Sequence, residues 1–233
     1  MRIDVSWAKI PKGGFGESGD TIELVERPLG GISLILADGQ GSGPAAKRIS
    51  RLVSMKAVSL ISDGSRDGAV ARAVQDMLYT AREGRVTATL VVLSCDKHTN
   101  TVVIARNTPV PVLVRQNNVV VRLEEASEVI GTYRKTRPRM TELPLLPNTI
   151  LLTFSDGVMN AGKRFGKSLP WDMIEQELQA LDVRYMEEWV HSLMQRTLAL
   201  DKERPSDDVS IVALGIRSDV QNAIRTLSAS IPY

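Results

Sequence analysis

Short apolar runs of strand type recur along this chain, and two pairs of helical patterns interrupt them. Alternating or continuous apolar residues predict strands at 3–7, 21–26, 31–37, 86–95, 101–106, 110–115, 119–123, 140–143, 149–154 and 209–216. Apolar residues at helical spacing predict helices at 44–62, 67–82, 171–181 and 185–201. This order of elements limits the fold strongly, because each sheet face and each helix stripe must find apolar cover.

The short connections in the series indicate antiparallel pairing. The turns at 97–100 and 117–118 are short enough to join antiparallel neighbours, and 3–7 with 21–26 look like a further strand pair. Two stacked sheets with a helical hairpin on each outer face give every element its cover. We therefore predict an α+β fold, a four-layer α-β-β-α sandwich of two antiparallel sheets. The expected organisation is a single domain at 1–216, followed by a C-terminal extension at 217–233.

Composition narrows the classes of function. The chain has 233 residues, 29 Lys and Arg against 27 Asp and Glu, and a net charge of +2, so no global field favours nucleic acid or an anionic membrane. The single cysteine, Cys95, lies in an apolar run and is expected to be a small buried side chain. The N-terminus does not resemble a signal peptide, and no apolar run reaches the length of a membrane span, so we expect a cytoplasmic protein.

Four aspartates stand at the ends of predicted strands: Asp20, Asp38, Asp156 and Asp207. Glycine follows Asp38 and Asp156, so the backbone can turn sharply there and offer a carbonyl oxygen as a further ligand. A site built only from oxygen suits Mg²⁺ or Mn²⁺ rather than Zn²⁺. Two such cations sharing a carboxylate would activate water against a phosphate ester. Any one of these residues alone could be an ordinary turn aspartate, but four in this order favour a metal site.

The motifs around these aspartates resemble a known family. They are Ser18-Gly19-Asp20, Ala37-Asp38-Gly39-Gln40-Gly41-Ser42-Gly43, Thr87-Ala88-Thr89-Leu90, Phe154-Ser155-Asp156-Gly157-Val158 and Asp207-Asp208-Val209-Ser210. In this order they are similar to metal-dependent protein phosphatases of type 2C, the PPM family, and most of all to the bacterial branch typified by sporulation stage II protein E.

The resemblance implies roles for individual residues. Asp38 would bridge two metal ions, Mn²⁺ or Mg²⁺, and orient the attacking water. Asp156 and Asp207 would complete one metal site, and Asp20 with the Gly39 carbonyl would serve the other. Asp208 stands where such phosphatases often have asparagine, so a supporting or capping role is expected for it.

The sequence also departs from the family pattern. Animal members carry a histidine two residues after the bridging aspartate, whereas this chain has Gln40, which cannot donate a catalytic proton. The nearest cation before Asp20 is Lys12, where an arginine that grips phosphate would be expected. Both histidines, His98 and His191, are far in sequence from every motif and are expected at the surface or in packing.

Two other patterns have a weaker link to function. The run 14–19 satisfies the dinucleotide-binding pattern G-x-G-x-x-G, but it leads into a strand rather than a helix, which argues against nucleotide binding. Basic residues gather at 134–139 and 163–167. A solvated surface is the ordinary interpretation of such clusters, and if both border the metal site they could receive an acidic phosphoprotein.

The predicted function is hydrolysis of phosphoserine or phosphothreonine by a metal-dependent protein phosphatase. The resemblance implies a bacterial signalling protein as substrate and partner, such as a small antagonist protein of a sigma-factor cascade or a stress scaffold, with neither nucleic acid nor membrane as a partner. Two alternatives stay open: a catalytically inactive partner-binding module of the same fold, and a phosphatase of small phosphomonoesters.

Overall fold

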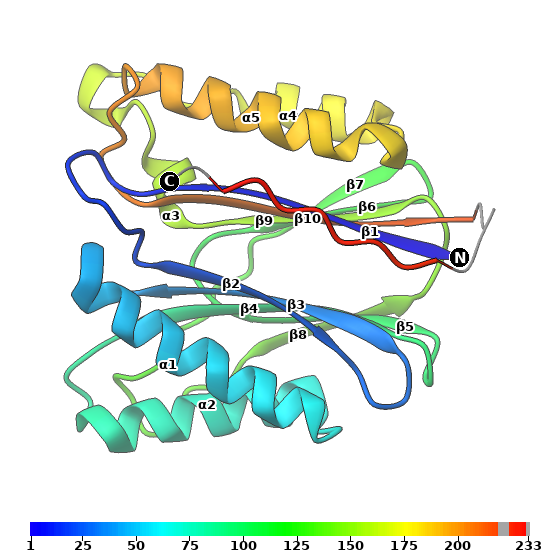
Figure 1. Ribbon diagram of the computed structural model, residues 1–233, viewed down its shortest axis with the longest axis horizontal. Helices are drawn as coiled ribbons and strands as arrows, with labels where there is room; N and C mark the ends of the chain where they lie inside the picture. Colours follow the sequence, from blue (N-terminus) through cyan, green and yellow to red (C-terminus); the bar gives the residue numbers. More distant parts are fainter. Residues whose placement is uncertain (219–223, 232–233) are drawn as a thin grey trace.

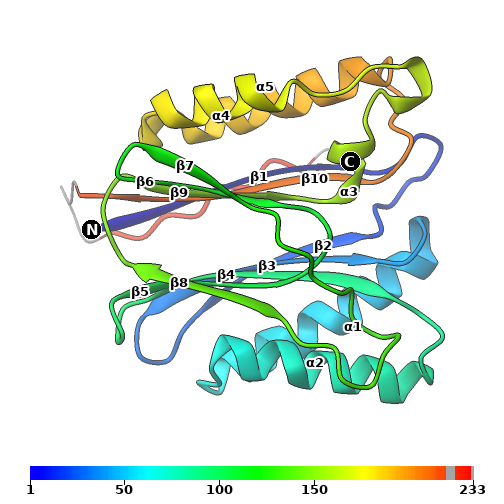
Figure 2. The same cartoon turned by 180° about the vertical axis from the view of Figure 1, so that it is seen from behind.

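The computed structural model describes residues 1–218 and 224–231. Two antiparallel sheets of five strands each are stacked face to face, and a helix pair covers the outer face of each sheet (Figure 1). The four layers are equally clear from behind (Figure 2). The predicted α-β-β-α sandwich is therefore confirmed.

The first sheet has the strand order β1-β10-β9-β6-β7. Its strands are β1 (Arg2–Ile10), β6 (Val112–Gln116), β7 (Val119–Leu123), β9 (Thr149–Phe154) and β10 (Val209–Arg217). Helices α4 (Trp171–Ala180) and α5 (Met186–Leu200) cover its outer face. They pack there because both helices are amphipathic, and residues such as Ile174, Leu178 and Leu193 join one apolar cluster with the outward side chains of β9 and β10.

The second sheet has the order β2-β3-β4-β5-β8. Its strands are β2 (Asp20–Glu26), β3 (Gly31–Gly39), β4 (Ala88–Asp96), β5 (Thr101–Asn107) and β8 (Arg139–Pro144). Helices α1 (Gly43–Ser62) and α2 (Asp67–Arg82) cover its outer face, where Val53, Val74 and Leu78 are fully buried against the sheet. The predicted helix boundaries at 67 and 82 agree with the structure.

The predicted pairing of the first two strands is wrong. All nine residues of β1 pair with β10 in the first sheet, while β2 pairs with β3 in the second. The segment 11–19 therefore carries the chain from one sheet to the other. Alternation of apolar and polar residues identifies a strand but not its partner, and β1 gains more by packing Ala8 and Ile10 against the cluster under α5.

The central layer of the molecule is a third apolar cluster, which lies between the two sheets. Leu34, Leu93, Ile104, Leu151 and Leu214 are all at most 1% exposed there. Cys95 belongs to the same cluster and is buried, as predicted. Burying side chains of this size contributes roughly 1.5–3 kcal/mol each, so this layer fixes how the two sheets face each other.

Three short elements were not predicted: the helix α3 (Asp156–Asn160) and the 3₁₀ turns η1 (Lys163–Phe165) and η2 (Val183–Tyr185). Each is too short to show a hydrophobic period. The strand β10 ends at Arg217, one residue into the predicted extension. Within that extension 224–231 has no regular secondary structure, and 219–223 and 232–233 lie outside the described residues. In the described chain, no helix combines the length and apolar character needed to cross a membrane.

Candidate active site

The first two aspartates of the predicted site face each other across a strand pair. Asp20 opens β2 and Asp38 lies near the end of β3, and the register places them directly opposite each other. Residues opposite each other in an antiparallel pair share a face of the sheet. Because Ile22 and Leu36 alternate in phase with them and pack in the central layer, both carboxylates lie on the inner face of the second sheet.

Asp20 is held by contacts from both sheets. Its side chain is 0% exposed, and the hydroxyl of Ser210 on β10 donates to Oδ2 at 2.6 Å. The backbone N–H of Asp20 donates to Ser18 Oγ at 3.2 Å, and its carbonyl accepts from Lys47 Nζ on α1 at 2.7 Å. The other carboxylate oxygen, Oδ1, is buried and has no hydrogen-bond partner among the described residues. Such an oxygen is costly to bury unless a ligand satisfies it.

The pKa values report the same crowding of acids. Burial raises the pKa of Asp38 to about 9, and the neighbouring charges of Asp20, Asp156 and Asp207 add to the effect. Burial also raises the pKa of Asp20 to about 6, although its bond from Ser210 opposes the shift. Without a cation, the pair therefore holds a proton at neutral pH, because two buried carboxylates in contact cannot both stay charged.

Asp156 and Asp207 approach this pair from the first sheet. Asp156 is the first residue of α3 and follows β9 directly, while Asp207 precedes β10. Burial and the charge of Asp207 raise the pKa of Asp156, and Lys163 lowers it. Asp207 Oδ1 accepts from Ser42 Oγ, the residue before α1, at 3.2 Å. The two sheets thus bring all four predicted aspartates into one electrostatic cluster at one end of the sandwich.

The glycines that follow two of these aspartates are required by close packing. A Cβ on Gly39 would lie 2.1 Å from the carbonyl oxygen of Ala46 on α1, and a Cβ on Gly157 would lie 2.1 Å from that of Asp208. Neither glycine has a positive φ. Their role is therefore not the sharp turn that we expected from the sequence, but the close approach of one helix to β3 and of another to β10.

The side chain of Asp208 contacts a distant segment of the chain. Its Oδ1 accepts from the backbone N–H of Lys12 at 2.9 Å, which ties the segment between β1 and β2 to the start of β10. Its Oδ2 is buried without a hydrogen-bond partner in the described part of the chain.

Among the described residues, no three His, Cys, Asp or Glu side chains are arranged so that they could hold a metal ion as they stand. The chemistry of the cluster nevertheless fits hard divalent cations, because every available donor is an oxygen and a buried oxygen of Asp20 lacks a partner. The raised pKa values of Asp20 and Asp38 indicate negative charge that lacks compensation.

Gln40 turns away from the acids. Its Oε1 accepts from the backbone N–H of Thr87 at 3.0 Å, and its own N–H donates to the Thr87 carbonyl at 3.0 Å. It therefore links β3 to the segment before β4. His98 and His191 are both exposed, as predicted.

Several residues near the site were missed or set aside in the sequence. Ser210 and Ser155 belong to the quoted motifs, but no role was assigned to them. Thr89, another motif residue without an assigned role, lies opposite Asp38 in the register of β3 and β4. Lys47 follows the glycine-rich loop by four residues and showed no motif of its own. Only the fold brings its ammonium group to the Asp20 carbonyl and to Thr21 Oγ1, at 3.0 Å.

Comparison with known families identifies the family to which the chain belongs. The model of the family described as stage II sporulation protein E (SpoIIE) matches residues 28–217, well over half of the sequence. This chain belongs to the SpoIIE family. SpoIIE proteins are phosphatases of the PP2C type, so the chain is a homologue of metal-dependent serine/threonine phosphatases that hydrolyse phosphoric monoesters. Among curated proteins, no sequence matches this chain.

Solved structures share the fold at low sequence identity. The PP2C phosphatase domain of SpoIIE from Bacillus subtilis, with a fragment of its regulatory domain, superposes with a TM-score of 0.76 and 17% identity. That match covers 94% of this chain but only 64% of the SpoIIE chain, less than two thirds of it. The serine/threonine phosphatase Stp1 from Staphylococcus aureus gives a TM-score of 0.74 and 15% identity, and the match covers 94% of this chain and 96% of the Stp1 chain. RsbX in complex with magnesium gives a TM-score of 0.70 and 13% identity, and the match covers 92% of this chain and 95% of the RsbX chain.

Proposed function

We propose that this chain is a metal-dependent protein phosphatase that removes phosphate from phosphoserine or phosphothreonine. We further propose that Asp20, Asp38, Gly39, Asp156 and Asp207 hold two divalent cations, Mg²⁺ or Mn²⁺. The observation that carries the proposal is the buried pair Asp20 and Asp38, whose raised pKa values indicate a site that needs positive charge. The magnesium complex of a similar structure, RsbX, supports the choice of metal.

The residues of the site would have separate roles in the reaction. Asp38, central to the cluster, would bridge the two cations and hold the attacking water by accepting a hydrogen bond from it. The Ser210 hydroxyl holds the carboxylate of Asp20 in one orientation, and Lys47 holds the backbone carbonyl of the same residue. When bound, the cations would supply Lewis-acid activation of water and neutralise charge on the phosphoryl oxygens. Gln40 cannot donate a proton to the leaving serine or threonine oxygen and both histidines lie elsewhere, so this proton would come from water or another group.

A phosphorylated signalling protein is the proposed substrate. The similar SpoIIE structure is that of a cell fate determinant with a regulatory domain, which supports control by protein contacts rather than metabolism of a small ester. A small antagonist protein of a sigma-factor cascade, or a phosphorylated stress scaffold, would suit a chain of this family.

The test is phosphate release from a phosphoserine peptide. The wild type and the Asp38→Asn variant are stripped of metal, and Mn²⁺ or Mg²⁺ is then added back. We expect the cations to restore activity to the wild type alone. Hydrolysis of small phosphomonoesters with no turnover of phosphopeptides would favour the small-molecule phosphatase, and a folded, cation-loaded wild type without any activity would favour a partner-binding module.

A further inference from the structure

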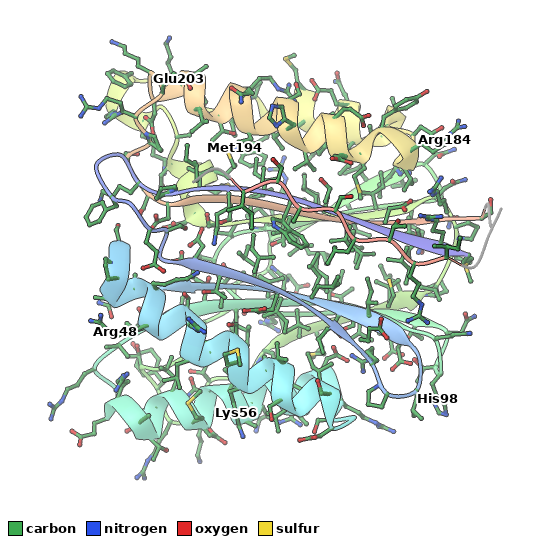
Figure 3. The ribbon with its side chains drawn as sticks, in the orientation of Figure 1. Arg48, Lys56, His98, Arg184, Met194 and Glu203 are labelled. Atoms are coloured by element: carbon green, nitrogen blue, oxygen red, sulfur yellow. The ribbon has the colours of Figure 1, made fainter. Side chains whose placement is uncertain are left out.

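A cluster of exposed cations borders the candidate site on the side of the first sheet. We call this surface the basic rim, and it consists of Lys163, Arg164, Lys167, Lys202 and Arg204. The first three follow Asp156 by seven to eleven residues, and the last two precede Asp207 by five and three. In Figure 3 the label of Glu203 marks the corner of the molecule where the second of these loops lies, at the end of α5. The rim is thus connected at both ends to candidate metal ligands.

A buried carboxylate organises the two loops of the rim. Asp201 is 2% exposed, and its Oδ1 accepts from the backbone N–H of Gly162 at 3.1 Å while its Oδ2 accepts from that of Ser206 at 3.0 Å. Arg164 adds an ion pair to Asp201 at 3.4 Å and donates to the carbonyl of Arg204. The surface is therefore held in place before any partner binds, which lowers the entropy cost of binding.

An aromatic ring lies among the cations. Phe165 is 38% exposed, with the guanidinium of Arg164 at 4.9 Å and the ammonium of Lys202 at 4.4 Å from the ring centroid. Both distances are within the range of a cation–π contact. The partly exposed ring therefore adds apolar surface to the rim.

Most of the charge on the rim is not neutralised. No carboxylate of the described residues pairs with Lys167, Lys202 or Arg204, and Glu203 is the one exposed acid within 160–168 and 201–206. Lys163 donates to Asn160 Oδ1 at 2.7 Å, which is a neutral partner. An anionic partner would find several free donors at this surface.

The second basic segment, 134–139, is a weaker candidate. Arg139 lies 4.0 Å from Glu125, and Arg134 lines an open hollow of about 440 Å³ together with Asp76 and Glu83. Acids thus already stand beside these cations.

We propose that the basic rim docks an acidic segment of the phosphoprotein substrate, next to the phosphorylated residue. This inference rests on the proposed function, because the phosphoryl group must reach the aspartate cluster for the neighbouring chain to cross the rim. Charge complementarity favours Asp- and Glu-rich sequence. Nucleic acid fits less well, since the rim carries a single aromatic ring and the whole chain only +2 net charge.

The experiment compares two matched double charge reversals. Lys167→Glu with Arg204→Glu removes rim charge without touching Asp201, and Arg66→Glu with Lys97→Glu makes the same change at exposed positions near the opposite end of the molecule. Lys97 is the neighbour of His98, which Figure 3 labels far from Glu203. The probes are a phosphoserine peptide flanked by glutamates, its neutral counterpart flanked by glutamines, and p-nitrophenyl phosphate. Binding is followed by fluorescence anisotropy and turnover by phosphate release.

We expect the rim variant to lose roughly tenfold or more in kcat/KM and in affinity for the acidic peptide, with less than about a twofold change for the neutral peptide and the small ester. The control variant should behave as wild type, and salt should weaken the preference for the acidic peptide. Equal effects on both peptides, or a wild type without preference, would overturn the inference. So would tighter binding of a single-stranded oligonucleotide than of the acidic peptide.

The failure of the docking proposal can be told apart from failure of the proposed function. A wild type that hydrolyses the small ester but does not distinguish the peptides refutes the docking surface alone. A wild type that hydrolyses nothing refutes the phosphatase, while anisotropy still decides whether the rim binds acidic sequence.

Discussion

Asp20 and Asp38 lie directly opposite each other on β2 and β3, and the charge of Asp20 raises the pKa of Asp38. Two buried acids in this position destabilise the metal-free fold once both are ionised. The strand register that creates the conflict is the same register that places both groups where cations would bind. The pair therefore lowers the stability of the metal-free protein and at the same time provides the negative charge that cations would bind. Such a conflict between stability and function is common at functional sites.

The first prediction is that Asp38→Asn stabilises the metal-free protein. Raised pKa values of Asp20 and Asp38 mean that their contribution to stability is complete below about pH 4, the unfolded value, and is lost as the pH rises through about 6 and about 9. Asparagine cannot ionise, so the variant escapes most of this loss. Thermal unfolding in chelator at pH 5, 7 and 9 should show a Tm gain that grows with pH, reaching about 2–4 °C or more at pH 9.

The control for this prediction is Asp182→Asn. The carboxylate of Asp182 is exposed and bonded to Arg184, and this contact lowers the pKa of Asp182. This variant should give no gain at any pH. Equal Tm values for the wild type and Asp38→Asn at pH 9 would show that the buried acids do not repel each other.

The second prediction concerns Ser210, whose hydroxyl bonds Asp20 Oδ2 at 2.6 Å from the opposite sheet. Ser210→Ala leaves a buried carboxylate oxygen without its donor, so we expect the affinity for Mn²⁺ to fall by about 10–100-fold. Titrating Mn²⁺ while following Tm measures this without relying on activity. Ser192→Ala, at an exposed position of α5, is the control. An unchanged Mn²⁺ midpoint in the Ser210 variant would remove Asp20 from the proposed ligands.

Much of the fold could be predicted because its elements are long and periodic. The helices α1 and α2 and the strands β7 and β9 begin and end within about a residue of the predicted positions, since continuous hydrophobic patterns determine them. The pairing of the strands could not be predicted from these patterns. Alternation in β1 and β2 does not encode which sheet each strand joins, and their assignment to different sheets depends on β10, which lies about two hundred residues further along.

The candidate site, like the fold, could be predicted only in part from the sequence. The four aspartates could be named from the sequence because they stand at the ends of predicted strands within an ordered set of motifs, of which those of Asp20, Asp38 and Asp156 contain glycine. Their supporting contacts could not, because Ser210 meets Asp20 across the sandwich and Lys47 reaches it from a helix surface. Asp201 escaped notice for a similar reason: it looks like an ordinary helix-terminal acid until the fold closes two loops around it.

The third prediction is that Cys95 does not react in the native protein. The residue is 0% exposed, and burial raises the pKa of its thiol to about 12, so both the thiolate and access to it are missing at pH 8. A chromogenic thiol reagent should label the protein only after denaturant is added, with one equivalent released. Rapid labelling of the folded protein would show that the central layer opens readily near β4.

The fourth prediction concerns Gly39, where β3 passes beneath α1. A Cβ there would lie 2.1 Å from the Ala46 carbonyl oxygen, a backbone atom that cannot move without the helix. Gly39→Ala should therefore cost about 1–3 kcal/mol of unfolding free energy, as forced overpacking does. Because α1 begins beside Ser42, which contacts Asp207, the shift should also lower phosphatase activity.

Gly16→Ala is the matched control, since a Cβ at Gly16 meets no atom within 4 Å and its φ is not in the left-handed region. Urea unfolding of both variants, followed by circular dichroism, gives the two free energies. If Gly39→Ala unfolds at the same urea concentration as Gly16→Ala, then α1 can move away from β3 at no cost. The close approach of α1 to the candidate metal ligands would then be a loose contact rather than a constraint on the site.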